Sequence, residues 1–231
     1  PFMGKTFGPE ERCRMGIESP FGAGEAIGAA ALRAREVIKA SRRHLSDGGL
    51  FYSEDFDPQD APSGPRIVFC EGFRVRDNPW FSPLPFAPVR GEILELDDPR
   101  IDFLNGGTWF LPQGPGKALA GSTFDWDDLE SGPTDEGTKR IMEGLSYLNA
   151  PKPSVTGQRS GVRPGTRDRM PIMGTHPKKP SMSIFNGFGS RGGTLIPLCA
   201  ELFAEYLLED NPLPEELDLR RFPEANSLPS P

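Results

Sequence analysis

Apolar residues recur at intervals of three and four positions in two long stretches, a spacing that places them on one side of a helix. The stretch 25–45 has this spacing, and the SDGG that follows it favours a helix end. The stretch 134–148 opens with Thr134 as a candidate N-cap, followed by acids in the first turn. A third helix is expected from about Leu195 to Leu208.

Short apolar runs bounded by turn residues predict strands between these helices. The expected strands are 50–52, 66–70, 89–96, 108–111, 117–123, 154–162 and 182–186. The run 66–70 is apolar enough for a strand with both faces covered, whereas the runs between 89 and 123 alternate with polar turns and predict an antiparallel meander. Residues 1–21 have no clear period, although Glu10 to Met15 could form a helical turn.

The order of these elements predicts an α+β fold in two domains. The chain leaves one domain, builds a second and mostly antiparallel one, and returns to the first. Proline and aromatic residues concentrate in 73–88, which indicates an ordered connection at a domain boundary. We therefore expect segments 1–85, 86–160 and 161–222, followed by a flexible tail at 223–231.

Composition narrows the partners and the compartment. The net charge of −7 and the isoelectric point near 5.0 give no basic footprint for nucleic acid or an anionic membrane. No apolar run approaches the roughly 20 residues of a spanning helix, and no secretory signal is recognisable. Three widely spaced cysteines, without metal-ligand spacing, predict reduced thiols in a cytoplasmic protein. The opening Pro1 suggests a cut or processed end.

Two glycine-rich segments are candidates for a ligand loop. GAGEAIG at 22–28 resembles a dinucleotide-binding turn, but a charged segment ending in proline precedes it instead of a buried strand, which favours a helix-entry loop. GFGSRGGT at 187–194 follows an apolar strand and precedes an apolar helix, so its backbone amides could approach a partly negative ligand. A tight strand-to-helix turn explains the second segment equally well.

Arg163 is the candidate for binding a substrate. It ends a predicted strand in SGVRPGTRDRMPIMG (160–174), where prolines and glycines fix the path of the chain. A rigidly placed guanidinium suits a substrate carboxylate. Pairing of Arg163 with Asp168 or with a backbone carbonyl in a structural turn is an equal alternative.

Several segments, in this order, resemble the C-terminal portion of the D-amino-acid oxidase superfamily, which includes glycine oxidase and sarcosine oxidase. The resemblance spans residues 1–222. Its segments are PFMGKTFGPEE (1–11), RIVFCEGF (66–73), VRGEIL (89–94), TWFLPQGPGKALAGSTFDWDD (108–128), GVRPGTRDRMPIMG (161–174), SIFNGFGSRGGTLIPLCAELFAEYL (183–207) and RRF (220–222).

The resemblance implies FAD-dependent oxidation of an amine or amino acid, with hydride transfer to the flavin and no catalytic side chain. It implies that 1–85 and 161–222 are parts of an FAD-binding α/β domain and that 86–160 is the substrate domain. Arg163 would bind the substrate carboxylate, with Trp109 and Phe110 near the substrate. The residues implied along the flavin are Gly72, Gly187, Gly189, Ser190, Arg191, Gly192, Gly193 and Thr194.

The chain also departs from the family's pattern. Gly161 stands where sarcosine oxidases carry the cysteine that tethers the flavin, so noncovalent FAD is expected, and Glu71 replaces the small residue usual before Gly72. The family's N-terminal nucleotide-binding unit has no counterpart, which predicts weak or no FAD binding by these 231 residues alone. A fragment of an intact oxidoreductase, a flavin-free binding or structural domain, and one chain of a heteromeric enzyme are the alternatives. Oxidase or dehydrogenase activity and a homo-oligomer are left open.

Overall fold

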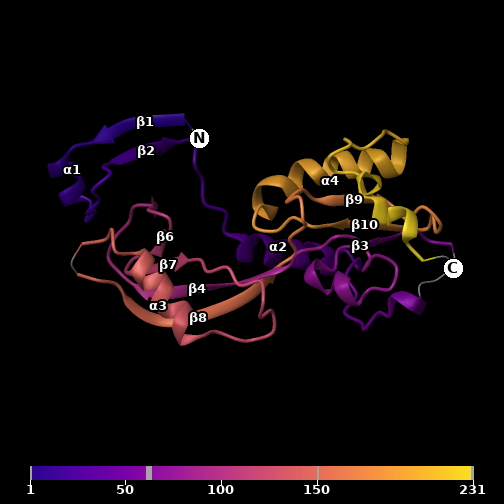
Figure 1. Ribbon diagram of the computed structural model, residues 1–231, viewed down its shortest axis with the longest axis horizontal. Helices are drawn as coiled ribbons and strands as arrows, with labels where there is room; N and C mark the ends of the chain where they lie inside the picture. Colours follow the sequence, from indigo (N-terminus) through magenta and orange to yellow (C-terminus); the bar gives the residue numbers. More distant parts are fainter. Residues whose placement is uncertain (1, 61–63, 150, 230–231) are drawn as a thin grey trace. The chain divides into compact units, whose positions relative to one another are not determined.

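The chain divides into two compact units, which are described separately (Figure 1). The computed structural model describes residues 2–60, 64–149 and 151–229. Unit 1 comprises Pro1–Ala31 and Arg90–Gly161, and unit 2 comprises Leu32–Val89 and Val162–Pro231. Residues 1–31 thus group with the segment expected to be the substrate domain, whereas the family resemblance implies that all of 1–85 belongs to the FAD-binding domain.

Unit 1 is built on a five-stranded sheet in the order β5-β6-β7-β4-β8. These strands are β4 (Val89–Asp97), β5 (Leu104–Asn105), β6 (Trp109–Gly114), β7 (Lys117–Gly121) and β8 (Ser154–Arg163). The pairs β5–β6, β6–β7 and β4–β7 are antiparallel, as predicted. The strands do not form a simple meander, because β4 lies next to β7 and not next to the strand that follows it in the chain.

Helix α3 (Asp135–Gly144) packs on one face of this sheet. Its N-cap is Thr134, as predicted, whose Oγ1 accepts a hydrogen bond from the Gly137 amide at 3.0 Å. The apolar side of the helix joins alternate residues of β4 in a buried cluster, in which Leu94 and Ile141 are 0% and 2% exposed. Burying this face supplies most of the stability of such a helix.

The first residues of unit 1 are more regular than the sequence indicated. β1 (Phe2–Phe7) and β2 (Ala23–Ile27) form an antiparallel pair, with α1 (Pro9–Arg14) between them. β2 overlaps the first three residues of the stretch 25–45, so the helix predicted from Glu25 begins later, at Ala34. Four of the five residues of β2 are exposed, and this explains why the strand has no pattern of alternating burial to reveal it.

Unit 2 contains a three-stranded sheet in the order β3-β10-β9. β3 (Ile67–Phe69) pairs parallel with β10 (Met182–Asn186), and β9 (Ile172–Thr175) pairs antiparallel with it. Strand β9 was not predicted, because its flanking prolines and internal glycine resemble a turn. Val68 is 37% exposed at the edge strand, so the expectation that both faces of β3 are covered was wrong.

Successive residues of β10 face different apolar clusters, because side chains along a strand point alternately to its two faces. Phe185 packs with helix α4 (Gly192–Glu209) in one cluster. Ile184 packs with Phe69 and Phe81 in the other cluster, to which the residues that follow β3 contribute, including the 3₁₀ helix η2 (Gly72–Asp77). The sheet is therefore covered by α4 on one side and by loops and 3₁₀ turns on the other (Figure 1).

The remaining helix of unit 2, α2 (Ala34–Asp47), has no buried residue. It starts after Gly28, whose φ of +77° is incompatible with a helix continuing from residue 25. The strand predicted at 50–52 was also wrong, because this segment has no regular structure. A further short 3₁₀ turn, η1 (Pro58–Asp60), precedes β3.

The end of unit 2 is more ordered than the flexible tail that the sequence suggested. Two 3₁₀ helices, η3 (Leu219–Arg221) and η4 (Pro223–Ser227), follow one another. Ala225 and Leu228 are 2% and 0% exposed in the cluster around β3 and β10. Residues 230 and 231 of the predicted tail lie outside the described residues.

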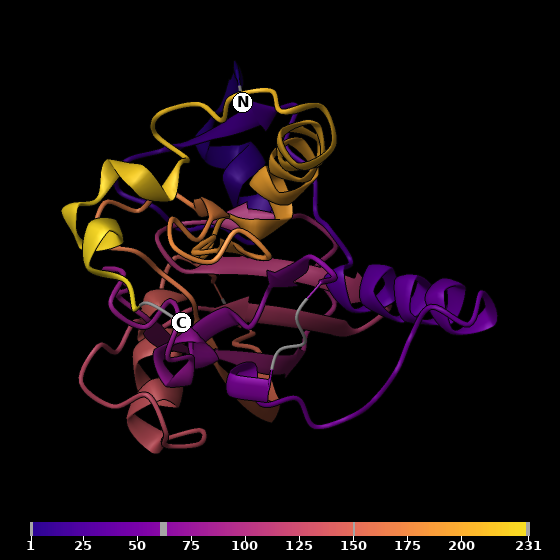
Figure 2. The same cartoon turned by 90° about the vertical axis from the view of Figure 1, so that its right-hand side faces the viewer.

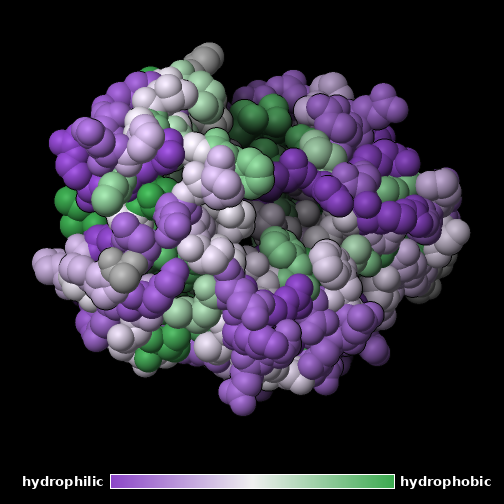
Figure 3. Space-filling view, turned by 60° about the vertical axis from the view of Figure 1, so that its left-hand side comes forward, coloured by the Kyte–Doolittle hydropathy of each residue, from purple (hydrophilic) through white to green (hydrophobic). Residues whose placement is uncertain are grey.

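The α+β fold class is confirmed, with mostly antiparallel sheets and helices in both units. On the face drawn in Figure 3, hydrophilic residues predominate and hydrophobic ones form separate patches, in keeping with the mean hydropathy of −0.45. Across the described residues, none of the helices has the length and apolar character needed to cross a membrane.

His176 makes the stability of unit 2 dependent on pH. The imidazole is 1% exposed and lies edge-on to the Phe81 ring, with the ring centres 5.5 Å apart. Burial, aided by Lys178 and Lys179, holds its pKa below the ordinary value. The unfolded chain, with a His pKa of about 6.5, therefore binds the proton more readily than the folded chain.

We expect the free energy of unfolding to fall as the pH drops below about 6.5, by up to about 1.4 kcal/mol for each pH unit until the folded pKa is reached. Urea unfolding at pH values from about 5 to about 8, which span the ordinary His pKa, measures how the free energy of unfolding changes with pH. His176→Gln should flatten this dependence relative to the unsubstituted chain, whatever its effect at neutral pH. Equal slopes for the two chains would contradict the assignment.

Candidate functional site

The candidate site lies where the parallel strands β3 and β10 end. Both strands point the same way, so their carboxyl ends open at the same edge of the sheet, which is where open α/β sheets bind ligands. Gly72 follows β3 and the glycine loop 187–194 follows β10. The Asn186 side-chain amide donates to the Gly72 carbonyl at 2.9 Å. Two segments more than a hundred residues apart in the chain are thereby joined.

Glycine is required at position 187. Its φ is +82°, a conformation that L side chains rarely adopt, and a Cβ atom there would lie 2.6 Å from Cγ2 of Thr166. Gly72 also has a positive φ, of +62°, but a Cβ atom there would meet nothing within 4 Å. Gly187 therefore serves close packing of the turn, whereas Gly72 leaves open space at the edge of the sheet.

The glycine loop presents backbone donors at the N-terminus of α4. The amides of Ser190, Gly192 and Gly193 have no acceptor among the residues that the structure describes. Those of Thr194 and Leu195 both donate to the carbonyl of the N-cap residue Arg191, at 3.0 Å. Unpaired amides and the helix dipole favour a ligand with negative charge, so the loop fits the phosphate or the polar flavin edge of FAD.

Arg163 stands beside this loop. It is the last residue of β8, and the next residue, Pro164, accepts a hydrogen bond from the Gly189 amide at 2.9 Å. The Gly165 amide donates back to the Arg163 carbonyl at 2.9 Å, which closes a tight turn. The guanidinium is half-buried, and desolvation holds its pKa below the ordinary value.

Asp168, the alternative partner of Arg163, is held by another arginine. Arg221 binds both oxygens of Asp168, with Nε to Oδ2 at 2.8 Å and Nη2 to Oδ1 at 3.3 Å. The Met170 amide and the Thr166 hydroxyl also donate to this carboxylate, and together these donors keep its pKa low despite the opposing effect of burial, which is the largest single influence. Asp168 thus fixes the turn after Arg163, and RRF (220–222) contributes to that turn through Arg221.

The two aromatic candidates belong to unit 1, whereas Arg163 and the glycines belong to unit 2. Trp109 and Phe110 are consecutive residues of β6 and point to opposite faces of the sheet. Phe110 is 1% exposed in the core with Leu94, and Trp109 is half-buried on the other face. Trp109 thus has the accessible ring, and a role for either residue in substrate binding stays a prediction.

Glu71 is a further residue at the edge formed by β3 and β10. Its carboxylate accepts a hydrogen bond from the Asn78 side chain at 2.8 Å, but burial raises its pKa above the ordinary value. The sequence offered one signal, an acid directly before the glycine that ends an apolar strand. This acid departs from the family's pattern, in which a small residue usually precedes the glycine.

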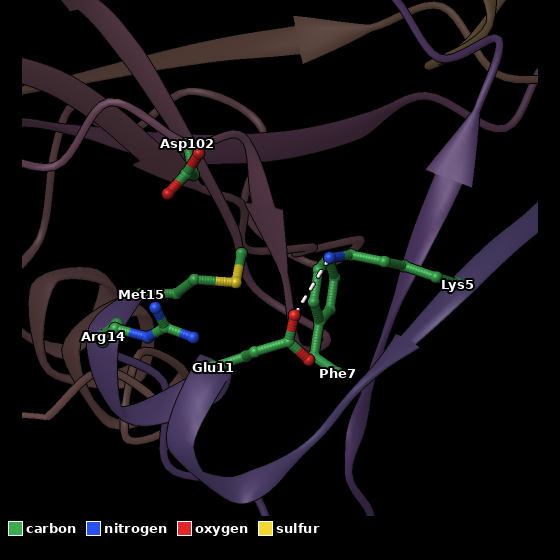
Figure 4. A pocket seen from close by; sticks show the side chains of 6 residues that line it. All are labelled: Lys5, Phe7, Glu11, Arg14, Met15 and Asp102. Atoms are coloured by element: carbon green, nitrogen blue, oxygen red, sulfur yellow. Dashed lines mark hydrogen bonds and ion pairs between the residues drawn. The ribbon is translucent and has the colours of Figure 1, made fainter.

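A surface hollow lies elsewhere, in unit 1. It measures about 350 Å³ and is lined by residues of β1, α1 and the β4–β5 connection, among them Lys5, Glu11 and Asp102 (Figure 4). The Lys5 ammonium and the Glu11 carboxylate pair at 3.0 Å and so satisfy each other's charge. The hollow contains none of the residues predicted to bind substrate or cofactor. No group of three potential metal ligands occurs within the described ranges.

Comparison with known proteins gives matches over most of the chain. A family model described as FAD dependent oxidoreductase matches residues 22–206. Among curated proteins, the tRNA 5-methylaminomethyl-2-thiouridine biosynthesis bifunctional protein MnmC of Aromatoleum aromaticum is 27% identical over 212 residues, covering 81% of this chain and 32% of that protein. The protein of the same name from Azoarcus sp. is 30% identical over 186 residues, covering 67% of this chain and 28% of that protein.

Solved structures show the same fold. Iminodiacetate oxidase from Chelativorans sp. has a TM-score of 0.73 at 19% identity, covering 92% of this chain and 65% of that one. Glycine oxidase from Geobacillus kaustophilus has a TM-score of 0.55 at 22% identity, covering 64% of this chain and 42% of that one. The chain thus spans about a third of the length of the curated relatives it matches.

Proposed function

Since this chain belongs to the family of FAD dependent oxidoreductases, we propose that it is the part of an amine or amino-acid oxidoreductase that binds the substrate and one side of the cofactor. The FAD expected from the sequence is the cofactor of this family. Its attachment is noncovalent, in keeping with Gly161 at the position of a tethering cysteine. We place this chemistry in the cytoplasm, where the free thiols of Cys13, Cys70 and Cys199 would stay reduced.

Bound FAD supplies the acceptor for a hydride from the carbon that carries the amine nitrogen. The chain's own residues would bind the cofactor and orient the substrate. The amides of Ser190, Gly192 and Gly193 would donate to FAD at the N-terminus of α4, and the absence of a side chain at Gly72 would leave room for it. Orientation of the substrate against a fixed cofactor accounts for much of the rate in this kind of reaction.

The half-buried guanidinium of Arg163 beside the glycine loop is the observation that carries this proposal. A carboxylate bound there would be held within the same unit as the loop, close to the cofactor's binding edge. A substrate carboxylate there would form charge-assisted hydrogen bonds with a guanidinium whose pKa is lowered by burial. An amine substrate that also carries a carboxylate satisfies both requirements.

A second candidate substrate is an amine carried by RNA. The curated relatives act, by their names, in the biosynthesis of tRNA 5-methylaminomethyl-2-thiouridine, and that group contains a secondary amine. The same cofactor site and the same Arg163 would then act on a modified nucleoside. The expectation from net charge that no nucleic acid takes part would not hold for such a substrate.

Mixing the flavin-loaded natural protein with substrate in the absence of oxygen tests the proposal. Amino acids and secondary amines, free or within tRNA, should bleach the visible absorbance of the flavin, because hydride transfer reduces it. Simple alcohols of similar size should leave the spectrum unchanged. If none of the amines reduces the flavin, although dithionite does, the proposed activity is wrong.

A further inference from the structure

Helix α2 is the most exposed regular element of unit 2. All fourteen residues from Ala34 to Asp47 are exposed, and Figure 2 shows the helix projecting from the other elements of unit 2. A helix without a buried face gains little from packing. Its surface is thus left uncovered by the residues that the structure describes.

The cationic residues of α2 lie on one side. Arg35, Lys39, Arg42 and Arg43 are spaced at intervals of four, three and one residues, which places them within an arc of about 100° on a helix with 3.6 residues per turn. From Arg35 to Arg43 the arc is about 12 Å long, at 1.5 Å per residue. Two acids lie at the border of this arc: Glu36, which approaches Lys39 at 3.6 Å, and Asp47, which follows four residues after Arg43.

This arc contrasts with the rest of the chain. Helix α2 contains four of the 26 Lys and Arg residues and two of the 33 acids, so it carries a net charge of +2 within a total of −7, and the remaining residues carry −9. The overall charge therefore conceals a local positive field. The field falls off within about 10 Å at ordinary salt, so a ligand at α2 experiences the arc more than the acidic remainder.

We propose that the cationic arc of α2, defined by Arg35, Lys39, Arg42 and Arg43, docks the phosphate backbone of a structured RNA. Side chains of this kind spaced along one helix face can each neutralise a phosphate and release its counterions. The identity of the RNA as tRNA rests on the second candidate function above, whereas the docking itself rests on the charge and exposure of α2.

An anionic lipid surface is the competing occupant, and the sequence of α2 favours RNA. Lipid docking would require the other side of the helix, where Val37, Ile38 and Leu45 lie, to enter the membrane. That side is aliphatic and short, and no aromatic residue, the usual anchor at a lipid interface, occurs within 34–47. RNA docking uses the cationic arc alone.

Binding of fluorescently labelled unmodified tRNA to residues 1–231, measured by anisotropy against salt concentration, tests this proposal. The triple variant R35Q/R42Q/R43Q should bind at least about tenfold more weakly, with a shallower dependence on salt, because three phosphate contacts are lost. The matched control K139Q/R140Q removes two exposed cations from α3 and should bind like the unsubstituted chain. Circular dichroism of each variant checks that the fold is kept.

Three results would overturn the proposal. These are undetectable tRNA binding at low salt, equal loss of binding in the α2 and α3 variants, and binding to phosphatidylserine vesicles that exceeds binding to tRNA and is weakened by I38Q. None of these measurements involves flavin reduction. Failure of RNA docking and failure of the proposed oxidation are therefore observed separately.

Discussion

Replacing Arg90 by Leu should lower the free energy of unfolding of unit 1 by about 3–5 kcal/mol, because it leaves a buried carboxylate without its counter-charge. Arg90 and Glu92 are 4% and 1% exposed, and Nη1 of Arg90 lies 3.0 Å from Oε1 of Glu92. Arg90 also binds Asp125 at 3.0 Å and donates from Nε to the Asp128 carbonyl at 2.8 Å. Urea unfolding followed by circular dichroism measures the loss.

The same experiment separates an ion pair from simple packing. Glu92 also accepts hydrogen bonds at 2.9 Å from the amide and the hydroxyl of Thr134, so it holds the N-cap of α3 to the sheet. R90L/E92Q should be more stable than R90L, because the side-chain amide that replaces the Glu92 carboxylate in the double variant can still accept a hydrogen bond from Thr134 but carries no buried charge. The exposed Arg140 provides a control, and R140L should change the stability by no more than about 0.5 kcal/mol. A loss below about 1 kcal/mol for R90L would contradict the role of the pair.

Arg163→Ala in the natural protein should raise the KM for a carboxylate-bearing amine by roughly 30- to 700-fold, equivalent to about 2–4 kcal/mol of lost binding. The variant lacks the guanidinium that would bind the carboxylate, so substrate binding is weakened. The kcat should change less, because the lost contact is made in the bound substrate as well as in the transition state. The KM of the Arg163→Lys variant should lie between those of the unsubstituted protein and of Arg163→Ala, since an ammonium keeps the charge but not the planar pair of donors. Steady-state kinetics with substrate over a wide concentration range gives both constants.

Two amine substrates, one with and one without a carboxylate, distinguish a substrate-binding role of Arg163 from a structural one. An amine of the same shape without a carboxylate should show little further loss with R163A, because it never used the guanidinium. Arg159 lies four residues earlier on β8 and pairs with Glu95 at 2.8 Å, so R159K is a matched change that should leave both constants unaltered. An equal rise in KM for the two amines would assign Arg163 to the turn instead.

Elements with strong periodic burial could be predicted from the sequence. Strand β10 has the predicted limits, because four of its five residues are buried and a glycine follows it. Helix α3 was recognisable from Thr134 and from the spacing of Ile141 and Leu145. Gly187 and its neighbours were identified as a candidate loop because glycines between a strand and a helix let backbone amides approach a ligand, although a tight turn explained them equally well. These features are local, because the residues that determine each of them lie within a short stretch of the sequence.

Other features depend on contacts between distant segments. Strand β9 pairs with β10 although Pro171 and Gly174 indicate a turn, and its burial decides the outcome. The ion pair of Arg90 and Glu92 could not be inferred, because charged residues in a strand usually mark the solvent side. Their partners, such as Asp125 and Thr134, lie more than thirty residues away in the chain. The joining of Gly72 to Asn186 is of the same kind.

The parallel pairing of β3 with β10 also determines the order in which the protein can mature during synthesis. Phe69 and Ile184 are register partners separated by more than a hundred residues, and most of unit 1 is encoded between them. At about 5–20 residues per second, the ribosome needs roughly 6–25 s to pass from one strand to the other. During that time β3 has no partner strand while unit 1 is complete enough to fold. We expect nascent chains arrested before β10 to protect unit 1 from proteolysis and to leave β3 open to cleavage or to capture by a chaperone.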